Sequence, residues 1–143
     1  MSKKFTHAAA MDAIRAALAE VTQRILYVED NSIVREVTAE LLAQEQRDIV
    51  AVATAEEALH EFREHPFNVV ITDVSLPQMS GLDLARKLLD LNPNVLIIVA
   101  SGYHLDLTLQ KWGPNVRAIV KPFEAADIDA LIADLQKTGG AGD

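Results

Sequence analysis

Short apolar runs recur along the chain and are separated by longer segments of mixed polarity. Each run is rich in valine, isoleucine or leucine and is bounded by polar or turn-forming residues. Runs of this length and composition predict buried β-strands. The expected strands are residues 24–28, 49–53, 68–72, 95–100 and 116–120.

The segments between these runs have the spacing of helices, with apolar residues at steps of three and four. In the first such segment the apolar residues that fall on one side are Ile33, Val34, Val37, Leu41 and Leu42. Thr54, with Glu57 three residues later, forms a capping box at the start of the second. The expected helices are residues 32–46, the segment from the Thr54 cap to His65, 81–91, a weak helix over 104–112, and 124–137, before a flexible tail.

This regular alternation of strand and helix predicts an α/β fold. Strands that are apolar on both faces fit a parallel sheet covered by helices on each side. Right-handed crossovers then give a doubly wound arrangement, in which functional groups collect at the carboxyl ends of the strands.

The first 23 residues differ from the rest of the chain. Met11, Ile14, Leu18 and Val21 follow helical spacing, whereas residues 1–10 have no periodicity and are expected to be loose. Three interpretations remain open: a helix docked on the domain or free in solvent, a dimerisation or partner helix, and a vector-derived remnant. We therefore expect an extension over residues 1–23, a domain over 24–137 and a tail over 138–143.

Composition excludes several classes of function. The 143 residues suit one domain, and the net charge of −8 argues against nucleic acid as the main partner. The absence of cysteine excludes disulfides, thiolate nucleophiles and cysteine-ligated zinc. No apolar run is long enough to span a bilayer or to form a secretory signal, so we expect no membrane partner and a cytoplasmic location.

Polar side chains that could bind a ligand or take part in a reaction follow four of the expected strands. They are Glu29-Asp30-Asn31, Asp73, Ser101-Gly102 and Lys121-Pro122-Phe123. Singly, each has an ordinary explanation, such as a helix cap, a turn or a solvated loop. Together, carboxylates at one sheet edge must protonate or hold a cation, and hard oxygen ligands favour Mg²⁺. A cation, a lysine and a hydroxyl around a lone aspartate suit the binding and transfer of a phosphoryl group.

These segments resemble the receiver domain of bacterial two-component response regulators. The similar stretches are ILYVEDNSIVRE, TDVSLPQMSGLDL, VASGYH and IVKPF. In the second, Pro77 and Gly81 follow Asp73 at the family's spacing. The resemblance covers about residues 24–137. It implies the flavodoxin-like, CheY-like fold, with a five-stranded parallel sheet in the order 2-1-3-4-5 wound by five helices.

The resemblance also implies roles for individual residues. Asp73 would accept a phosphoryl group from a histidine kinase or a histidine phosphotransfer protein. Glu29, Asp30, Asp73 and the backbone carbonyl of Ser75 would hold Mg²⁺. Lys121, with a cis bond to Pro122, would bind a phosphoryl oxygen, and Ser101 would donate a hydrogen bond to the phosphoryl group. A surface formed by residues 104–112, 116–120 and 124–137 would respond to phosphorylation.

One position departs from the family pattern. Many receivers carry Tyr or Phe three residues before the lysine as a rotating switch, whereas this chain has Ala118. Tyr103 could replace the switch or could merely cover the mouth of the pocket. In the first case, Tyr103→Ala would leave phosphorylation intact but abolish the response of helix 104–112. We also expect Tyr103 to hinder the hydrolytic water, so that Tyr103→Ala speeds loss of the acyl phosphate.

The leading interpretation is a single-domain response regulator that signals to an unknown downstream protein by contact, without binding nucleic acid directly. Whether it acts as a monomer or as a homodimer stays open. It would not be an enzyme beyond catalysing its own phosphorylation and dephosphorylation. Alternatives are a receiver fragment of a hybrid histidine kinase and a phosphorelay intermediate or phosphate sink. A remote alternative is a Mg²⁺-dependent aspartyl phosphatase. Such enzymes carry a second aspartate two residues after the nucleophile, where this chain has Ser75.

Overall fold

A computed structural model describes residues 6–20, 23–43, 47–102 and 113–140. The helices and strands in this part of the chain are α1 (His7–Glu20), β1 (Gln23–Val28), α2 (Ser32–Leu42), β2 (Arg47–Val52), α3 (Ala55–Glu64), β3 (Val69–Asp73), α4 (Gly81–Leu91), β4 (Leu96–Ser101), β5 (Val116–Val120) and α5 (Ala125–Gly140). The helix expected over residues 104–112 lies outside the described residues.

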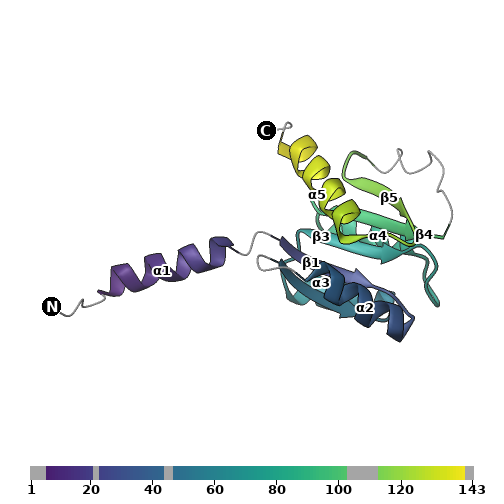
Figure 1. Cartoon of the computed structure of the whole chain (residues 1–143), viewed down its shortest axis with the longest axis horizontal. Helices are drawn as coiled ribbons and strands as arrows, with labels where there is room; N and C mark the ends of the chain where they lie inside the picture. Colours follow the sequence, from purple (N-terminus) through teal and green to yellow (C-terminus); the bar gives the residue numbers. More distant parts are fainter. Residues whose placement is uncertain (1–5, 21–22, 44–46, 103–112, 141–143) are drawn as a thin grey trace.

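The strands form one parallel sheet in the order β2-β1-β3-β4-β5 (Figure 1). The predicted α/β fold and strand order are therefore confirmed. The register places Asp73 beside Ala100 and Ser101 beside Val120. Because the strands are parallel, the residues that follow β1, β3, β4 and β5 meet at one edge of the sheet.

Two apolar cores lie on opposite faces of the sheet, as period-two alternation requires. Leu26 and Val28 of β1 belong to the core that includes Ala55, Leu59, Leu84 and Leu88 of α3 and α4. Ile25 and Tyr27 belong to the other core, with Leu42 of α2 and Ile128 and Ile132 of α5. Both faces of the central strands are buried, which explains why their sequences are almost continuously apolar.

The ends of several helices differ from the predicted ones. The cap at Thr54 is confirmed, since its Oγ1 accepts the Glu57 N–H at 3.1 Å. The predicted end of α2 at Gln46 is wrong, because Ala43 is already extended and the helix closes at Leu42. The helix expected to end at Lys137 continues to Gly140. The proposed boundaries at residues 23/24 and 137/138 stay predictions.

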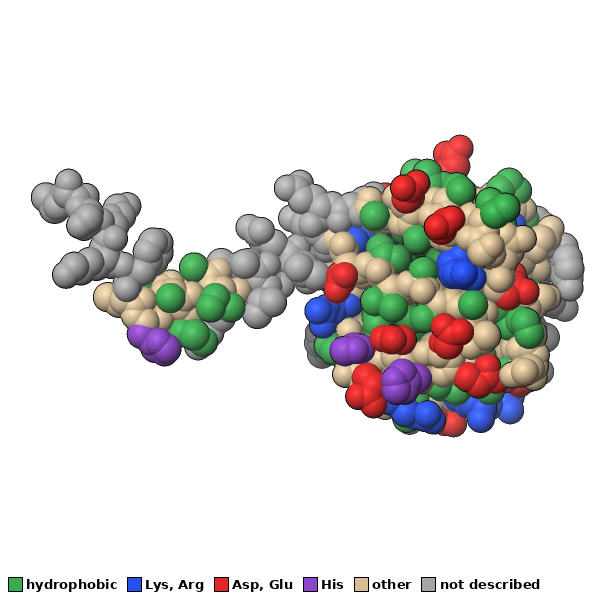
Figure 2. Space-filling view, turned by 90° about the horizontal axis from the view of Figure 1, so that it is seen from below, with side chains coloured by type: hydrophobic (Ala, Val, Ile, Leu, Met, Phe, Trp, Pro, Cys, Tyr) green, Lys and Arg blue, Asp and Glu red, His purple; other side chains and the backbone are tan. Residues whose placement is uncertain are grey.

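Helix α1 stands away from the sheet and its covering helices (Figure 1). It begins at His7, earlier than the expected Met11, so residues 7–10 are helical rather than loose. The reason is Thr6, whose Oγ1 accepts the Ala9 N–H at 3.0 Å and caps the first turn. Apolar side chains are visible on the surface of this helix (Figure 2). In the described part of the chain, no helix has both the length and the apolar character needed to cross a membrane.

Helix α2 leaves most of its apolar stripe uncovered. Leu42 is fully buried, but Ile33 is 71% exposed, Val37 52% and Leu41 53%. An apolar helical stripe normally marks the face that packs on the core. Here the described structure buries only one end of that stripe.

Candidate functional site: an acidic pocket at the carboxyl edge of the sheet

Three carboxylates converge where β1 and β3 end. Glu29 and Asp30 follow β1, and Asp73 is the last residue of β3. One oxygen from each lies within 4.8 Å of one from each of the others. Glu29 is buried, Asp73 is partly buried and Asp30 is exposed, so the cluster opens to solvent on one side. Like charges this close repel unless a cation or protons compensate them.

Lys121 supplies one compensating charge. Its Nζ lies 2.7 Å from Glu29 Oε1 and 3.0 Å from Asp73 Oδ2, so the ammonium bridges two of the three carboxylates. Burial lowers the pKa of Lys121, but the hydrogen bonds to Glu29 and Asp73 outweigh it and leave the pKa above its usual value. Lys121 therefore remains a cation at neutral pH.

The backbone around Asp73 is fixed by close contacts. The Ser75 N–H donates to Asp73 Oδ1 at 3.3 Å, and the Gly81 N–H donates to the Val74 carbonyl at 2.8 Å. A Cβ at Gly81 would lie 2.1 Å from the Asp73 carbonyl oxygen, so the first residue of α4 must be glycine. The start of α4 is therefore in close contact with the end of β3, which carries the Asp73 carboxylate.

Ser101 and Lys121 are joined through their backbones. Ser101 ends β4 and is buried, and its carbonyl accepts the Lys121 N–H at 2.7 Å. The Lys121–Pro122 peptide bond is cis, as the resemblance implied. The hydroxyl of Ser101, the last residue of β4, and the ammonium of Lys121, the residue after β5, therefore come from adjacent strand ends at the edge that carries the carboxylates.

Of the two residues expected to modulate the switch, the structure describes Ala118 but not Tyr103. Ala118 lies on β5 and is exposed, so β5 carries no aromatic ring at this position. Tyr103 lies outside the described residues, and its proposed role as a substitute switch stays a prediction. The role expected for the Ser75 carbonyl also stays a prediction.

Arg35 is a residue of the site that the sequence analysis missed. Its Nη1 donates to the carbonyl of Glu29 at 2.8 Å and lies 3.5 Å from that of Asp30. Asn31 was considered only as part of the acidic segment, but its Oδ1 caps α2 by accepting the Ile33 and Val34 N–H groups. The sequence did hold a signal for Arg35, because it is a basic residue in the first turn of the helix that directly follows the acidic pair. Together the two residues fix the loop that presents the carboxylates.

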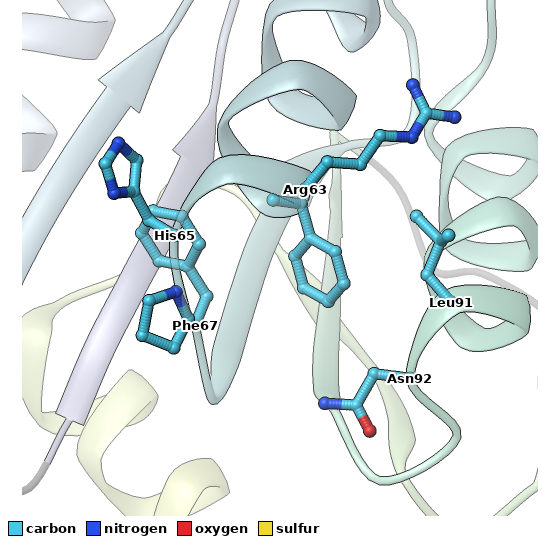
Figure 3. A pocket seen from close by; sticks show the side chains of 7 residues that line it. Arg63, His65, Phe67, Leu91 and Asn92 are labelled. Atoms are coloured by element: carbon cyan, nitrogen blue, oxygen red, sulfur yellow. The ribbon is translucent and has the colours of Figure 1, made fainter.

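A separate hollow of about 460 Å³ lies near the C-terminal ends of α3 and α4 (Figure 3). It is lined by Phe62, Arg63, His65, Pro66, Phe67, Leu91 and Asn92. The rings of Phe62 and Phe67 are stacked, with centroids 6.4 Å apart. None of the described residues that line it carries a carboxylate, so it does not share the chemistry of the acidic pocket.

The oxygen ligands that the acidic pocket offers suit a magnesium ion. Glu29, Asp30 and Asp73 offer hard oxygen ligands, and the exposed side of the cluster admits the water molecules that Mg²⁺ retains. A bound cation would relieve the repulsion that Lys121 compensates only in part.

Comparison with known proteins agrees with this geometry. The family model described as the response regulator receiver domain matches residues 25–133. The chain is 26% identical over 117 residues to the response regulator receiver protein CpdR of Brucella abortus, covering 80% of this chain and 95% of that protein. It is 32% identical over 120 residues to the two-component response regulator PhoP of Pseudomonas aeruginosa, covering 82% of this chain but only 53% of PhoP.

Solved structures show the same fold. A CheY-like receiver domain protein from Methanospirillum hungatei JF-1 superposes with a TM-score of 0.73 at 27% identity, covering 85% of this chain and 98% of that one. The response regulator TrrA from Thermotoga maritima, solved in complex with Mg(2+)-BeF, gives a TM-score of 0.68 at 28% identity, covering 79% and 98%. The family match covers most of the chain, and the chain belongs to the response regulator receiver domain family.

Proposed function

We propose that Asp73 is the phosphoacceptor of this receiver domain. An oxygen of its carboxylate would attack the phosphorus of a phosphohistidine on a histidine kinase or histidine phosphotransfer protein. The new O–P bond forms as the P–N bond breaks, and the imidazole leaves with the electron pair. The observation that carries the proposal is the Lys121 ammonium, 2.7 Å from Glu29 and 3.0 Å from Asp73, beside a carboxylate that reaches solvent.

The surrounding residues would stabilise the charge of the transferred group. Lys121 would bind a phosphoryl oxygen, and Ser101 would donate a hydrogen bond to another. Glu29, Asp30, Asp73 and the Ser75 carbonyl would hold Mg²⁺, which when bound neutralises charge on the phosphoryl oxygens. Since catalysis of phosphoryl transfer is mainly positioning and charge stabilisation, these groups would also allow self-phosphorylation from a small donor.

A small-donor reaction tests this role. The protein is incubated with acetyl phosphate and Mg²⁺, and its intact mass is measured. We expect one phosphoryl group per chain in the wild type, none in Asp73→Asn, and normal labelling in Asp90→Asn, which changes an exposed acid of α4. An unlabelled wild type, or equal labelling of Asp73→Asn, would contradict the proposal. Steady turnover of a simple phosphate ester would instead support the phosphatase alternative.

We further propose that the domain signals by contact with another protein. The proposal rests on the likeness to CpdR, a response regulator receiver protein, 95% of whose length the match covers. A comparison of proteins captured by the beryllofluoride-treated chain and by the untreated chain tests it. Capture that is the same in both states would argue for a relay or phosphate-sink role instead.

A further inference from the structure

Buried polar side chains are rare in the part of the chain that the structure describes. They are Glu29, Thr72 and Ser101. Glu29 and Ser101 belong to the candidate site, whereas Thr72 is the residue directly before Asp73 on β3 and is fully buried. Burial of a hydroxyl is unfavourable unless a hydrogen bond compensates it. The partner of the Thr72 hydroxyl therefore indicates what this side chain contributes.

The neighbours of Thr72 in the sheet are apolar. The register places it between Val28 of β1 and Val99 of β4, and both valines are fully buried. They belong to the core on the face covered by α3 and α4. Valine has nearly the shape of threonine and would occupy this position without burying a hydroxyl. Packing alone therefore favours an apolar residue here, and the hydroxyl needs another explanation.

The Thr72 hydroxyl contacts the backbone of the proposed phosphoacceptor. Its Oγ1 donates to the Asp73 carbonyl oxygen at 3.0 Å. The same oxygen is close to the start of α4, where a Cβ at Gly81 would lie 2.1 Å from it. The N–H of this peptide group belongs to Val74 and donates to the Ala100 carbonyl at 2.8 Å. Both polar ends of the peptide group that follows Asp73 are therefore held.

This peptide group affects where the Asp73 carboxylate lies, because both are attached to the same Cα. The carboxylate has Oδ2 3.0 Å from Lys121 Nζ and has an oxygen within 4.8 Å of the oxygens of Glu29 and Asp30. A tilt of the peptide group would move the carboxylate relative to these groups. A misplacement of about 1 Å can slow a reaction about 100-fold.

We propose that Thr72 is a positioning residue for phosphoryl transfer to Asp73. Its hydroxyl holds the Asp73 peptide group, and through it the carboxylate, in the orientation that the transfer needs. Thr72 acts only through Asp73 and does not touch the phosphoryl group. This role rests on the proposed function of Asp73 as the phosphoacceptor.

The rate of labelling by acetyl phosphate and Mg²⁺ tests this role in four variants of the full chain. Thr72→Val and Thr72→Ala both remove the hydroxyl, whereas Thr72→Ser keeps it and loses the methyl group. Val70→Ala is the control for stability, since it removes two methyl groups from a fully buried position of the same strand. We expect labelling about tenfold slower in the two variants without the hydroxyl and the wild-type rate in the other two.

Thermal unfolding of the same variants separates positioning from stability. Thr72→Ser and Val70→Ala lose buried methyl groups, so their midpoints should fall although their labelling rates do not. A wild-type rate in Thr72→Val, or a rate in Thr72→Ser as low as that in Thr72→Val, would overturn the positioning role and leave the phosphoacceptor role intact. A wild type that is not labelled would overturn both.

The carbonyl carbon-13 resonance of Asp73 measures the hydrogen bond itself in the unphosphorylated protein. Loss of a hydrogen bond to a carbonyl oxygen moves this resonance upfield. We expect an upfield shift in Thr72→Val and Thr72→Ala but not in Thr72→Ser. An identical resonance in the wild type and Thr72→Val would mean that the hydroxyl does not hold the Asp73 carbonyl, and it would overturn the proposal.

Discussion

Replacing Gly81 with alanine tests how closely α4 is pressed against the phosphoacceptor strand. An alanine Cβ would lie 2.1 Å from the Asp73 carbonyl oxygen, 2.9 Å from its carbon and 3.0 Å from Val74 Cα. All three neighbours are backbone atoms, so the contact cannot be relieved by a side-chain rotation. The oxygen alone lies about 0.9 Å closer than the shortest contact that real Cβ atoms show, so the strand end or α4 must move.

The expected loss in the free energy of unfolding follows from two opposing effects. Overpacking against rigid surroundings costs about 3 kcal/mol at the upper end of its usual range. The better helix propensity of alanine returns at most about 1 kcal/mol. The net loss of about 2 kcal/mol should lower the thermal midpoint by about 4–8 °C for a domain of this size.

Thermal unfolding followed by circular dichroism measures this loss. Gly102→Ala is the matched control, since a Cβ there meets no described atom within 4 Å, and its midpoint should change little. If Gly81→Ala proved as stable as the wild type, the close approach between α4 and Asp73 would be refuted.

Three further predictions concern the cap, the buried tyrosine and the metal. Asn31→Ala removes the side chain that accepts two N–H groups of α2 and should cost about 1 kcal/mol in denaturant unfolding, whereas Ser32→Ala should cost little. Burial raises the pKa of Tyr27 in the folded protein above the value of about 10 that a tyrosine has in the unfolded chain. The neutral side chain therefore stabilises the fold below about pH 10, and this stabilisation is lost as the pH rises through the higher pKa of the folded state. Tyr27→Phe should therefore flatten the alkaline fall in unfolding free energy, and an equally steep fall in the variant would argue against this burial effect. Mg²⁺ should raise the thermal midpoint of the wild type, and Asp30→Asn should reduce that rise while Asp83→Asn, on the exposed first turn of α4, leaves it unchanged.

The sheet was predictable because its signals are local. The run at residues 95–100 is apolar throughout, and β4 is buried on both faces. The capping box at Thr54 likewise marked the start of α3 correctly. The positions of Glu29, Asp73 and Lys121 follow from the same logic, since parallel strands bring the residues after their ends to one edge.

The parts that the sequence did not predict depend on contacts between distant segments. Nothing near Gly81 indicates that its missing side chain makes room for the Asp73 carbonyl. The hydrogen bond from Arg35 to the Glu29 carbonyl depends on how α2 lies over the loop before it. The stripe containing Val37 has the spacing of a buried helix face, yet the domain leaves it exposed, because packing rather than periodicity decides what a helix covers.

The central claim is that Asp73 accepts the phosphoryl group, and chemical mapping of the acyl phosphate tests it most directly. The wild-type chain is phosphorylated with acetyl phosphate and Mg²⁺, reduced with borohydride, digested and analysed by mass spectrometry. Borohydride converts a phosphorylated aspartate to homoserine, which marks the site. We expect homoserine at position 73 and unchanged aspartate at position 30. Homoserine at any other acidic position, with Asp73 unmodified, would contradict the account.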